Sequence, residues 1–405
     1  MSLAAEILFW LSVAAVLYVY AGYPLLIAIV SRIRSNPVGK GNHLLSVSII
    51  ITAYNEERDL AAKLENTLAL EYDRDLLEII IASDCSTDST DQIASSFASR
   101  GVRLYRQPKR LGKTAAQNAA VERARGEVVL FSDATTLYQS DVLKVIMRSF
   151  ADPKVGCVAG RLIYVNPSKS NIGYGTRLYW DYESFIKRHE SRICSLIGVS
   201  GCLYAVRRSA YVPMYNEACS DFLIATKMVE QGLRAIYEPD AICFEETNRR
   251  PTRELEMRVR VITQTLSDLW RHRAMMNPFR SGLYALQLFS HKVMRYFVPF
   301  LLMTMVLSSL VLAPYSAFHL GILIAAFVFA VLTLLAWCLD AARISYRLLT
   351  FPYYFVLANL ASLLAFLKFL KGERYARWEP IRDPVENASG SASGSVPVTP
   401  NGSRQ

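Results

Sequence analysis

Acidic and hydroxyl side chains gather in three short segments of the sequence, each directly after a run of β-branched residues. The segments are Ala53-Tyr54-Asn55-Glu56-Glu57, Ser83 to Asp88, and Ser132 to Thr136. Carboxylates in such positions bind divalent cations, accept protons from hydroxyl groups, or accept charge-assisted hydrogen bonds. The same residue types also cap helix N-termini, a role that suits Asp88. The segments predict a site only if the fold brings them together.

The sequence around these segments alternates short apolar runs with longer amphipathic ones, as in βαβ units. Strands are expected at Leu45–Thr52, Leu77–Ala82, Val102–Arg106 and Val128–Phe131, and helices at Glu56–Leu70, Thr90–Arg100 and Lys113–Arg125. Strands that are so continuously apolar are typical of a parallel sheet covered on both faces. Ligands bind beyond the carboxyl ends of strands in such a sheet, so the three segments would share one edge. The expected fold class is α/β.

Several common functions are disfavoured by what this chain lacks. No GxGxxG follows the first strand, because Gly173-Tyr-Gly175 has neither the third glycine nor a preceding strand, and there is no GxxxxGK[ST] loop. The net charge of +10 comes from scattered residues whose clusters flank apolar runs, which favours a membrane surface over nucleic acid. Seven cysteines without a CxxC pair indicate reduced thiols rather than disulfides or a zinc site.

Four apolar runs are long enough to cross a membrane. The first, Ala4–Val30, carries the single charge Glu6 and is too long for the apolar part of a cleaved signal peptide. Arg32, Arg34 and Lys40 follow it, which places that side in the cytoplasm and the N-terminus outside. The other runs are Tyr296–Ala313, Leu320–Leu339 and Leu349–Leu370. The long middle region is therefore expected to be cytoplasmic.

The C-terminal region leaves two questions open. Residues 282–296 fit either an amphipathic helix in the interface or an extension of the next membrane helix. Four full spans would also put Lys371, Arg374, Arg377 and Arg382 outside, against the positive-inside trend. Either the last run, interrupted near Pro352, is re-entrant or interfacial, or the tail is an exception to the trend. The Gly/Ser/Pro-rich tail, 387–405, is expected to be disordered.

Four motifs together resemble a known family. VSIIITAYNEE, IIIASDCSTDST, LGKTAAQN and LFSDATT, in this order and spacing, resemble the family 2 inverting glycosyltransferases of the GT-A fold, and in particular membrane-bound bacterial polysaccharide synthases. The resemblance covers roughly residues 46–270. It implies a nucleotide-sugar donor, usually a UDP-sugar, one divalent cation, Mg²⁺ or Mn²⁺, and an acceptor that is deprotonated by a carboxylate.

The resemblance assigns the donor side of the site. It implies that Ala53, Tyr54, Glu56 and Asp84 hold the nucleoside, with Asp84 near the base. Lys113, at the start of a helix, would reach the diphosphate, although a solvated first-turn lysine is the alternative. Asp133 matches the metal-binding acid of a DxD signature, but Thr135 stands in place of the second acid. A cation would thus rest on one carboxylate, the donor phosphates and water.

The acceptor side is assigned in the same way. Asp221 stands where the family has its general base, with Ser220 in place of the usual glutamate; the alternative is a first-turn residue that interacts with the helix dipole. The resemblance implies acceptor-side roles for Trp180, Glu183, Gly201 and Gln264, while core packing is the alternative for Trp180. The QxxRW string of the synthases is only partly matched by Gln264-Thr-Leu-Ser267-Asp268-Leu-Trp270. Arg258 and Arg260 are candidates for the missing positive charge, and residues 245–253 for a loop over the site.

The sequence thus predicts an N-terminal anchor, 1–34, a GT-A catalytic domain, 44–272, and an interfacial helix with C-terminal membrane helices, 280–372. The expected function is inverting, metal-dependent transfer of a sugar to a lipid-linked or glycan acceptor at the cytoplasmic face of a bacterial plasma membrane, with membrane lipids and polysaccharide export machinery as partners. A catalytically silent, sugar-nucleotide-binding subunit is the alternative, because Thr135, Ser220 and Ser267 depart from the family pattern. A transporter is disfavoured, since the four runs carry no paired charges.

Overall fold

The computed structural model describes residues 2–42, 44–165, 171–246, 251–341 and 347–377. The tail at 387–405 and Arg382 lie outside these ranges. Within them a single mixed sheet has the strand order β3-β2-β1-β4-β7-β6-β8-β5. The strands are β1 (Val47–Ala53), β2 (Leu77–Ser83), β3 (Val102–Arg106), β4 (Val128–Asp133), β5 (Leu137–Tyr138), β6 (Val155–Val165), β7 (Tyr204–Arg207) and β8 (Arg234–Glu246).

The first half of the sheet is the parallel α/β unit that the sequence predicts. Strands β1, β2, β3 and β4 are mutually parallel neighbours, and the register pairs Ala53 with Ser83 and Thr52 with Asp133. The three acid-bearing segments therefore leave the sheet side by side at one edge. The second half mixes directions, since β7 is antiparallel to β4 and β6 while β6 and β8 are parallel. Only the first half shows the regular βαβ rhythm in sequence.

Helices cover both faces of this sheet. On one face the alternate residues Ile49 and Ile51 of β1 pack in a core with α3 (Leu60–Leu68), α4 (Thr90–Ser96) and α6 (Val142–Arg148). On the other face Ile50 packs with α5 (Lys113–Val121) and α8 (Ser220–Glu230). Every residue of β1 is buried, as a strand covered on both faces requires. Short 3-10 turns lie at Arg74–Leu76, Ala98–Arg100, Ser149–Ala151, Arg208–Ala210, Arg273–Met276 and Ala313–Tyr315.

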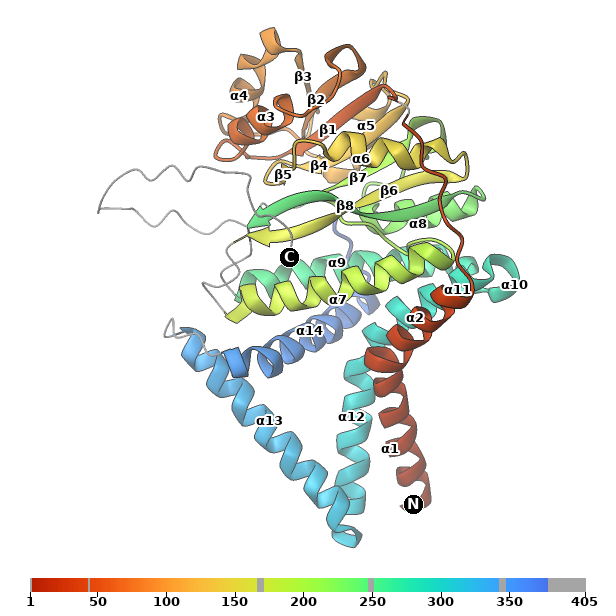
Figure 1. The fold of residues 1–405 in the computed structure, drawn as a ribbon. Helices are drawn as coiled ribbons and strands as arrows, with labels where there is room; N and C mark the ends of the chain where they lie inside the picture. The colour runs from red at the N-terminus through yellow and green to blue at the C-terminus, as the bar shows by residue number, and fades with distance from the viewer. Residues whose placement is uncertain (1, 43, 166–170, 247–250, 342–346, 378–405) are drawn as a thin grey trace, which may run out of the picture.

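Two long amphipathic helices lie between the sheet and the apolar helices. In Figure 1, α7 (Asn171–Ile193) and α9 (Pro251–Arg271) lie beneath the sheet, and α14 (Arg347–Leu370) packs against both of them. The prediction of a loop at 245–253 is wrong for the described residues of this range, because 245–246 end β8 and 251–253 begin α9. Residues 247–250 lie outside the described ranges.

Four helical stretches in the described residues are long and apolar enough to cross a membrane: Leu3–Ile33, Leu283–Tyr315, Ala317–Asp340 and Leu349–Leu370. The first stretch comprises α1 (Ser2–Leu17), a π-helical turn at Tyr18–Gly22 and α2 (Tyr23–Ile33). The second follows the short helix α10 (Pro278–Ser281) and comprises α11 (Leu283–Leu288), the π-helical turn η8 (Phe289–Val293) and α12 (Met294–Leu312). The third and fourth are α13 (Ala317–Ala341) and α14. Residues 283–296 form a continuous helical stretch with the rest of α12. In Figure 1, α12 and α13 join at the end farthest from the sheet, and α1 packs along α12.

The chain after α14 returns toward the sheet. The Gln264 side chain on α9 donates a hydrogen bond to the Tyr375 carbonyl at 2.6 Å. Gly112, which has a φ of +102°, lies so close to this segment that an added Cβ would come within 1.8 Å of the Ala376 carbonyl oxygen. Residues 371–377 therefore lie on the same side of the apolar helices as the sheet.

Candidate active site

The loops after β1 and β2 are joined by hydrogen bonds. Asn55 and Cys85, the second residues of the two loops, both have positive φ, which is uncommon for side-chain-bearing residues. The side-chain oxygen of Asn55, Oδ1, accepts a hydrogen bond from the Thr87 backbone amide at 2.8 Å. The Glu56 backbone amide donates a hydrogen bond to Thr90 Oγ1 at 2.7 Å. Backbone strain of this kind persists where neighbouring groups fix it, and it is enriched at binding sites.

Asp84 is fully buried and organises the next loop. Its carboxylate accepts hydrogen bonds from the amides of Leu111 and Gly112, at 2.8 and 3.0 Å, and from the Gln107 side chain at 2.7 Å. Burial raises the pKa of Asp84, and these hydrogen bonds oppose the rise. The carboxylate thereby holds the loop that begins helix α5 and presents Lys113. Beside this loop, the Arg110 guanidinium stacks over the Tyr54 ring at 3.7 Å from its centroid, while Ala53 is buried at the strand end.

Three predicted residues converge around Gly201. A Cβ at this glycine would lie 3.1 Å from an Asp221 carboxylate oxygen, 3.1 Å from the Lys113 ammonium and 3.6 Å from Asp133. Lys113 forms an ion pair with Asp133. Burial alone would lower the pKa of Lys113, but the Asp133 and Asp221 carboxylates outweigh it and raise the pKa. A Cβ at position 201 would thus be tightly packed against the Asp221 and Lys113 side chains and in ordinary contact with Asp133.

A second carboxylate stands beside Asp133, supplied by β8. Glu245 accepts a hydrogen bond from Thr135 Oγ1 at 3.0 Å, at the position where the DxD pattern would have its second acid. Burial, with a smaller contribution from Asp133, raises the pKa of Glu245 to about 7. Carboxylate and hydroxyl oxygens suit Mg²⁺ or Mn²⁺, so Asp133, Thr135 and Glu245 form a donor set of the right chemistry. The described residues contain no cluster of three His, Cys, Asp or Glu side chains that would form a complete protein cage. Such a cation would need donor phosphates or water as further ligands.

Asp221 lies in the first turn of α8, and a buried acid fixes that turn. Asp268 on α9 accepts from the Cys219 amide at 2.9 Å and from the Tyr215 hydroxyl. The Cys219 thiol in turn contacts Asp221 Oδ1 at 3.0 Å. Burial raises the pKa of Asp268 to about 7, against the effect of its two hydrogen bonds. Asp268 is thus a positioning residue for Asp221.

Arg260 on α9 faces the same acidic centre. It has no hydrogen bond or ion pair to another described residue, and it lies near Cys219, Asp221 and Asp133. Burial lowers the pKa of its guanidinium, and these three neighbours oppose that shift. Arg260, rather than Arg258, is therefore placed to bring positive charge to the site. Arg258 points to the membrane side, where it pairs with Glu254 at 2.8 Å.

The remaining acceptor-side predictions fall away from Gly201. Trp180 on α7 packs against the core and contacts Tyr164, with ring centroids 6.1 Å apart. Glu183 forms an ion pair with Arg295 at the start of α12. Gln264 holds the segment after α14, as described above. The sequence predictions missed Glu245 and Asp268, because neither follows a parallel strand in the predicted half of the sheet.

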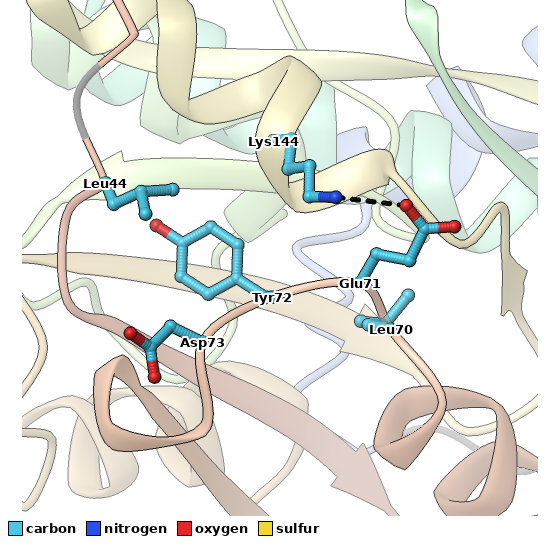
Figure 2. Close-up of a pocket in the computed structure, with 6 residues that line it drawn as sticks. All are labelled: Leu44, Leu70, Glu71, Tyr72, Asp73 and Lys144. Atoms are coloured by element: carbon cyan, nitrogen blue, oxygen red, sulfur yellow. Dashed lines mark hydrogen bonds and ion pairs between the residues drawn. The ribbon is translucent and has the colours of Figure 1, made fainter.

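A surface depression on the opposite edge is a poor candidate. It has a volume of about 390 Å³ and is lined by Leu44, Leu70, Glu71, Tyr72, Asp73 and Lys144 (Figure 2). It lies at the amino end of β1, where the Tyr72 hydroxyl donates to the Leu45 carbonyl, and its Lys144–Glu71 ion pair is exposed. Ligands of open α/β sheets bind at the carboxyl edge instead.

Comparison with known proteins now adds to the geometry. The sequence model of glycosyl transferase family 2 matches residues 48–213. Residues 48–213 are a family 2 glycosyltransferase domain. This range contains β1 to β4 and the Lys113–Asp133 pair, while Asp221, Glu245 and Arg260 lie beyond its end. The prediction of the family from the four motifs is confirmed.

Curated relatives match a little more than half of this chain. A poly-β-1,6-N-acetyl-D-glucosamine synthase from Staphylococcus aureus strain COL is 26% identical over 238 residues, covering 57% of this chain and 54% of that protein. An N-acetylglucosaminyltransferase from Rhizobium sp. strain N33 is 29% identical over 243 residues, covering 55% and 53%. The chain spans about half the length of these relatives.

A solved structure matches nearly the whole chain. The mannosyltransferase PcManGT from Pyrobaculum calidifontis, solved with GDP-Man and Mn²⁺, superposes with a TM-score of 0.71 and 22% identity, covering 90% of this chain and 99% of that one. The likeness confirms the predicted GT-A fold. The four apolar helices indicate association with a membrane.

Proposed function

We propose that the chain is an inverting glycosyltransferase that moves a sugar from a nucleotide-sugar, most simply a UDP-sugar, to a hydroxyl group of a lipid-linked or glycan acceptor. The convergence of Asp221, Lys113 and Asp133 around Gly201 carries this proposal. It brings a candidate base, a phosphate-binding cation and a cation-binding acid together at the carboxyl edge of the sheet. The bonding around Asp84 supports a nucleoside site between the loops after β1 and β2.

The arrangement of these residues supports a single nucleophilic displacement at C1 of the donor sugar. The Asp221 carboxylate accepts the proton of the acceptor hydroxyl while the hydroxyl oxygen attacks C1 of the donor sugar. The bond from C1 to the diphosphate breaks on the opposite side, and its electron pair leaves with the diphosphate. Lys113 and Arg260 approach the site from opposite elements and stabilise the departing charge. A divalent cation held by Asp133, Thr135 and Glu245 would supply further stabilisation of the diphosphate.

The orientation in the membrane is part of the proposal. We place the family 2 domain at the cytoplasmic face of a bacterial plasma membrane, with three crossings made by α1–α2, α12 and α13. Helix α14 then lies at the interface beneath α7 and α9, where the core that it shares with Ile197 and Phe222 supports it. This arrangement puts Lys371, Arg374 and Arg377 on the same side as Arg32 and Arg34, as the positive-inside trend requires. Acceptors in this membrane include the intermediates of cell-surface polysaccharide synthesis, and export machinery is a fitting partner.

Donor hydrolysis tests the proposal without a known acceptor. The purified full chain, given UDP-GlcNAc, UDP-Glc, UDP-Gal or GDP-Man with Mg²⁺ or Mn²⁺, should slowly release nucleoside diphosphate from at least one donor. Asp221→Asn should lower that rate at least about 100-fold, the usual scale for loss of a general base, whereas exposed Asp240→Asn on β8 should not. Donor binding without turnover in any condition would favour the silent sugar-nucleotide-binding subunit instead.

A further inference from the structure

Four cations gather where α7, α9 and α12 meet on the membrane side of the domain. They are Lys187 on α7, Arg258 on α9, Lys292 in η8 and Arg295 at the start of α12, and they are called the interface cation cluster below. Tyrosines hold the two guanidinium groups in place. The Arg258 guanidinium lies 4.7 Å from the centroid of the Tyr179 ring, and that of Arg295 lies 5.5 Å from the Tyr182 ring.

The cluster has more positive charge than its carboxylates neutralise. Glu183 pairs with Arg295 and Glu254 with Arg258. The third carboxylate, Glu190, bonds the Tyr23 hydroxyl at 2.6 Å and His291 at 2.8 Å through Oε1, while its Oε2 is buried without a partner among the described residues. Lys187 and Lys292 form no hydrogen bond or ion pair with a described residue, and the Lys187 ammonium lies 4.9 Å from the centroid of the Trp180 ring. The cluster is thus a built but incompletely neutralised cation site.

Part of this positive charge is sealed from water. Nε and Nη2 of Arg295 are buried and have no acceptor within the described residues. A buried donor without a partner costs about 1–3 kcal/mol, and a buried charge without one costs more. Lysines that merely extend to the headgroup region would carry no such cost, because their ammonium groups stay in water. An anion in the cluster would satisfy both Arg295 nitrogens and neutralise the lysines.

The cluster and the turn that carries the candidate base border the same apolar core. Tyr296, the residue after Arg295, packs in the same core cluster as Cys219. The Cys219 thiol contacts Asp221 at 3.0 Å. On α9, Arg260 faces Asp221 while Arg258, two residues earlier, faces the interface cation cluster. Residues two apart on an α-helix point to different faces, so an anionic group bound in the cluster would lie on the face of α9 that carries Arg258, at the level where the membrane helix α12 begins.

We propose that the interface cation cluster binds the phosphate or diphosphate of a lipid-linked acceptor, so that the acceptor sugar extends toward Asp221. This inference rests on the proposed transferase function and names its acceptor class. A phosphate offers several acceptor oxygens and negative charge, which match the free guanidinium nitrogens of Arg295 and the unpaired lysines. The lipid chain would leave along α12, whose outer face is apolar.

Thermal unfolding of the full chain in a neutral detergent tests the proposal with farnesyl diphosphate as the probe. The wild type should show a concentration-dependent rise in Tm that farnesol does not produce. Lys292→Met keeps the length of the side chain and removes its charge, so it should weaken the apparent affinity for farnesyl diphosphate about tenfold or more. Lys187→Met provides a second variant, and Lys154→Met, exposed on the catalytic side, is the matched control.

The possible results separate the sources of the anion. An equal response to farnesyl diphosphate in the wild type and both cluster variants, or none in the wild type, would overturn the proposal. An equal effect of inorganic diphosphate would show a free-anion site, and an equal effect of phosphatidylglycerol a general headgroup site; either result would also overturn it. Donor hydrolysis is measured in parallel and should be unchanged in the control variant Lys154→Met. Loss of hydrolysis in the wild type would count against the transferase itself and not against lipid phosphate binding.

Discussion

At the scale of single residues, the oxygen donors around Asp133 differ from the DxD signature, in which both acids belong to one loop. Thr135 occupies the second position of the pattern, and its hydroxyl donates to Glu245 from β8, on the other half of the sheet. A carboxylate from β8 thus lies beside Thr135, where the DxD pattern would have its second acid. Because this carboxylate comes from a different element, we expect the affinity for a cation to depend on the negative charge of Glu245.

Glu245→Gln should weaken cation binding while the fold is retained. The amide keeps the size of the side chain and can still accept from Thr135, but it lacks the negative charge that attracts a divalent cation. We expect the affinity for Mn²⁺, measured by paramagnetic resonance in the presence of UDP, to fall about 10- to 100-fold. Glu246→Gln, the exposed neighbour on the same strand, is the control and should bind Mn²⁺ like the wild type. Equal affinities in the two variants would remove Glu245 from the cation site.

The sequence predicted only the residues of the site that follow parallel strands or belong to a family motif. Asp133 and Asp84 come directly after strands whose carboxyl ends meet, so their placement at one edge follows from the α/β pattern. Asp221 was predicted from its place in the family pattern. Glu245 and Asp268 belong to β8 and α9, which contact the site only through tertiary packing. No local periodicity indicates such contacts.

At the scale of elements, helix α8 depends on α9 for the position of its first turn. Asp268 of α9 bonds the Cys219 amide, which is the residue before the helix, and it is fully buried. Its pKa of about 7 in the folded protein is well above that of an unfolded aspartate, because burial disfavours the charged form. The folded protein therefore binds more protons than the unfolded chain between about pH 4 and 7. The contribution of Asp268 to stability is greatest at low pH and is lost as the pH rises to about 7.

Asp268→Asn should remove this pH dependence. The amide oxygen can still accept from Cys219, and the variant has no charge to bury. We expect the Tm of the variant relative to the wild type to be higher at pH 8 than at pH 5, with a difference in unfolding free energy of at most about 4 kcal/mol. Thermal unfolding in detergent at the two pH values measures it, and Asp240→Asn on the surface is the control. A variant whose relative Tm is lower at pH 8 than at pH 5 would contradict the shifted pKa.

The elements themselves were predicted unevenly. β1 to β4 and their helices are recognisable because each strand is a continuous apolar run and each helix has one apolar face. The second half lacks these signals. β7 has only four residues, and β8 is interrupted by Pro239 and Asp240 near a shift in its pairing with β6. Antiparallel insertion of β7 between β4 and β6 is a tertiary arrangement that no run of residues encodes locally.

At the scale of the whole molecule, α14 decides how many times the chain crosses the membrane. Its length and composition suit a span, but Ala361 and Ala365 pack in a core with Ile262 and Leu266 of α9. The segment that follows contacts Gly112 and Gln264 in the catalytic half. An apolar run can satisfy its hydrophobic faces against protein as well as against lipid, so hydropathy alone overcounts the spans here.

Cysteine labelling on intact cells and on inverted vesicles tests three crossings against four. In a background without Cys85, Cys194 and Cys338, which are the accessible thiols of the described residues, single cysteines would replace Ser316 between α12 and α13, Arg374 after α14, and Arg58 in the catalytic domain. A membrane-impermeant maleimide should label Ser316→Cys only from outside. It should label Arg374→Cys only from the inside, together with Arg58→Cys, because residues 371–377 rest on the catalytic half of the molecule. Labelling of Arg374→Cys from outside, with Arg58→Cys labelled from inside, would make α14 a fourth span and would require the contact with Gln264 to be absent in the membrane.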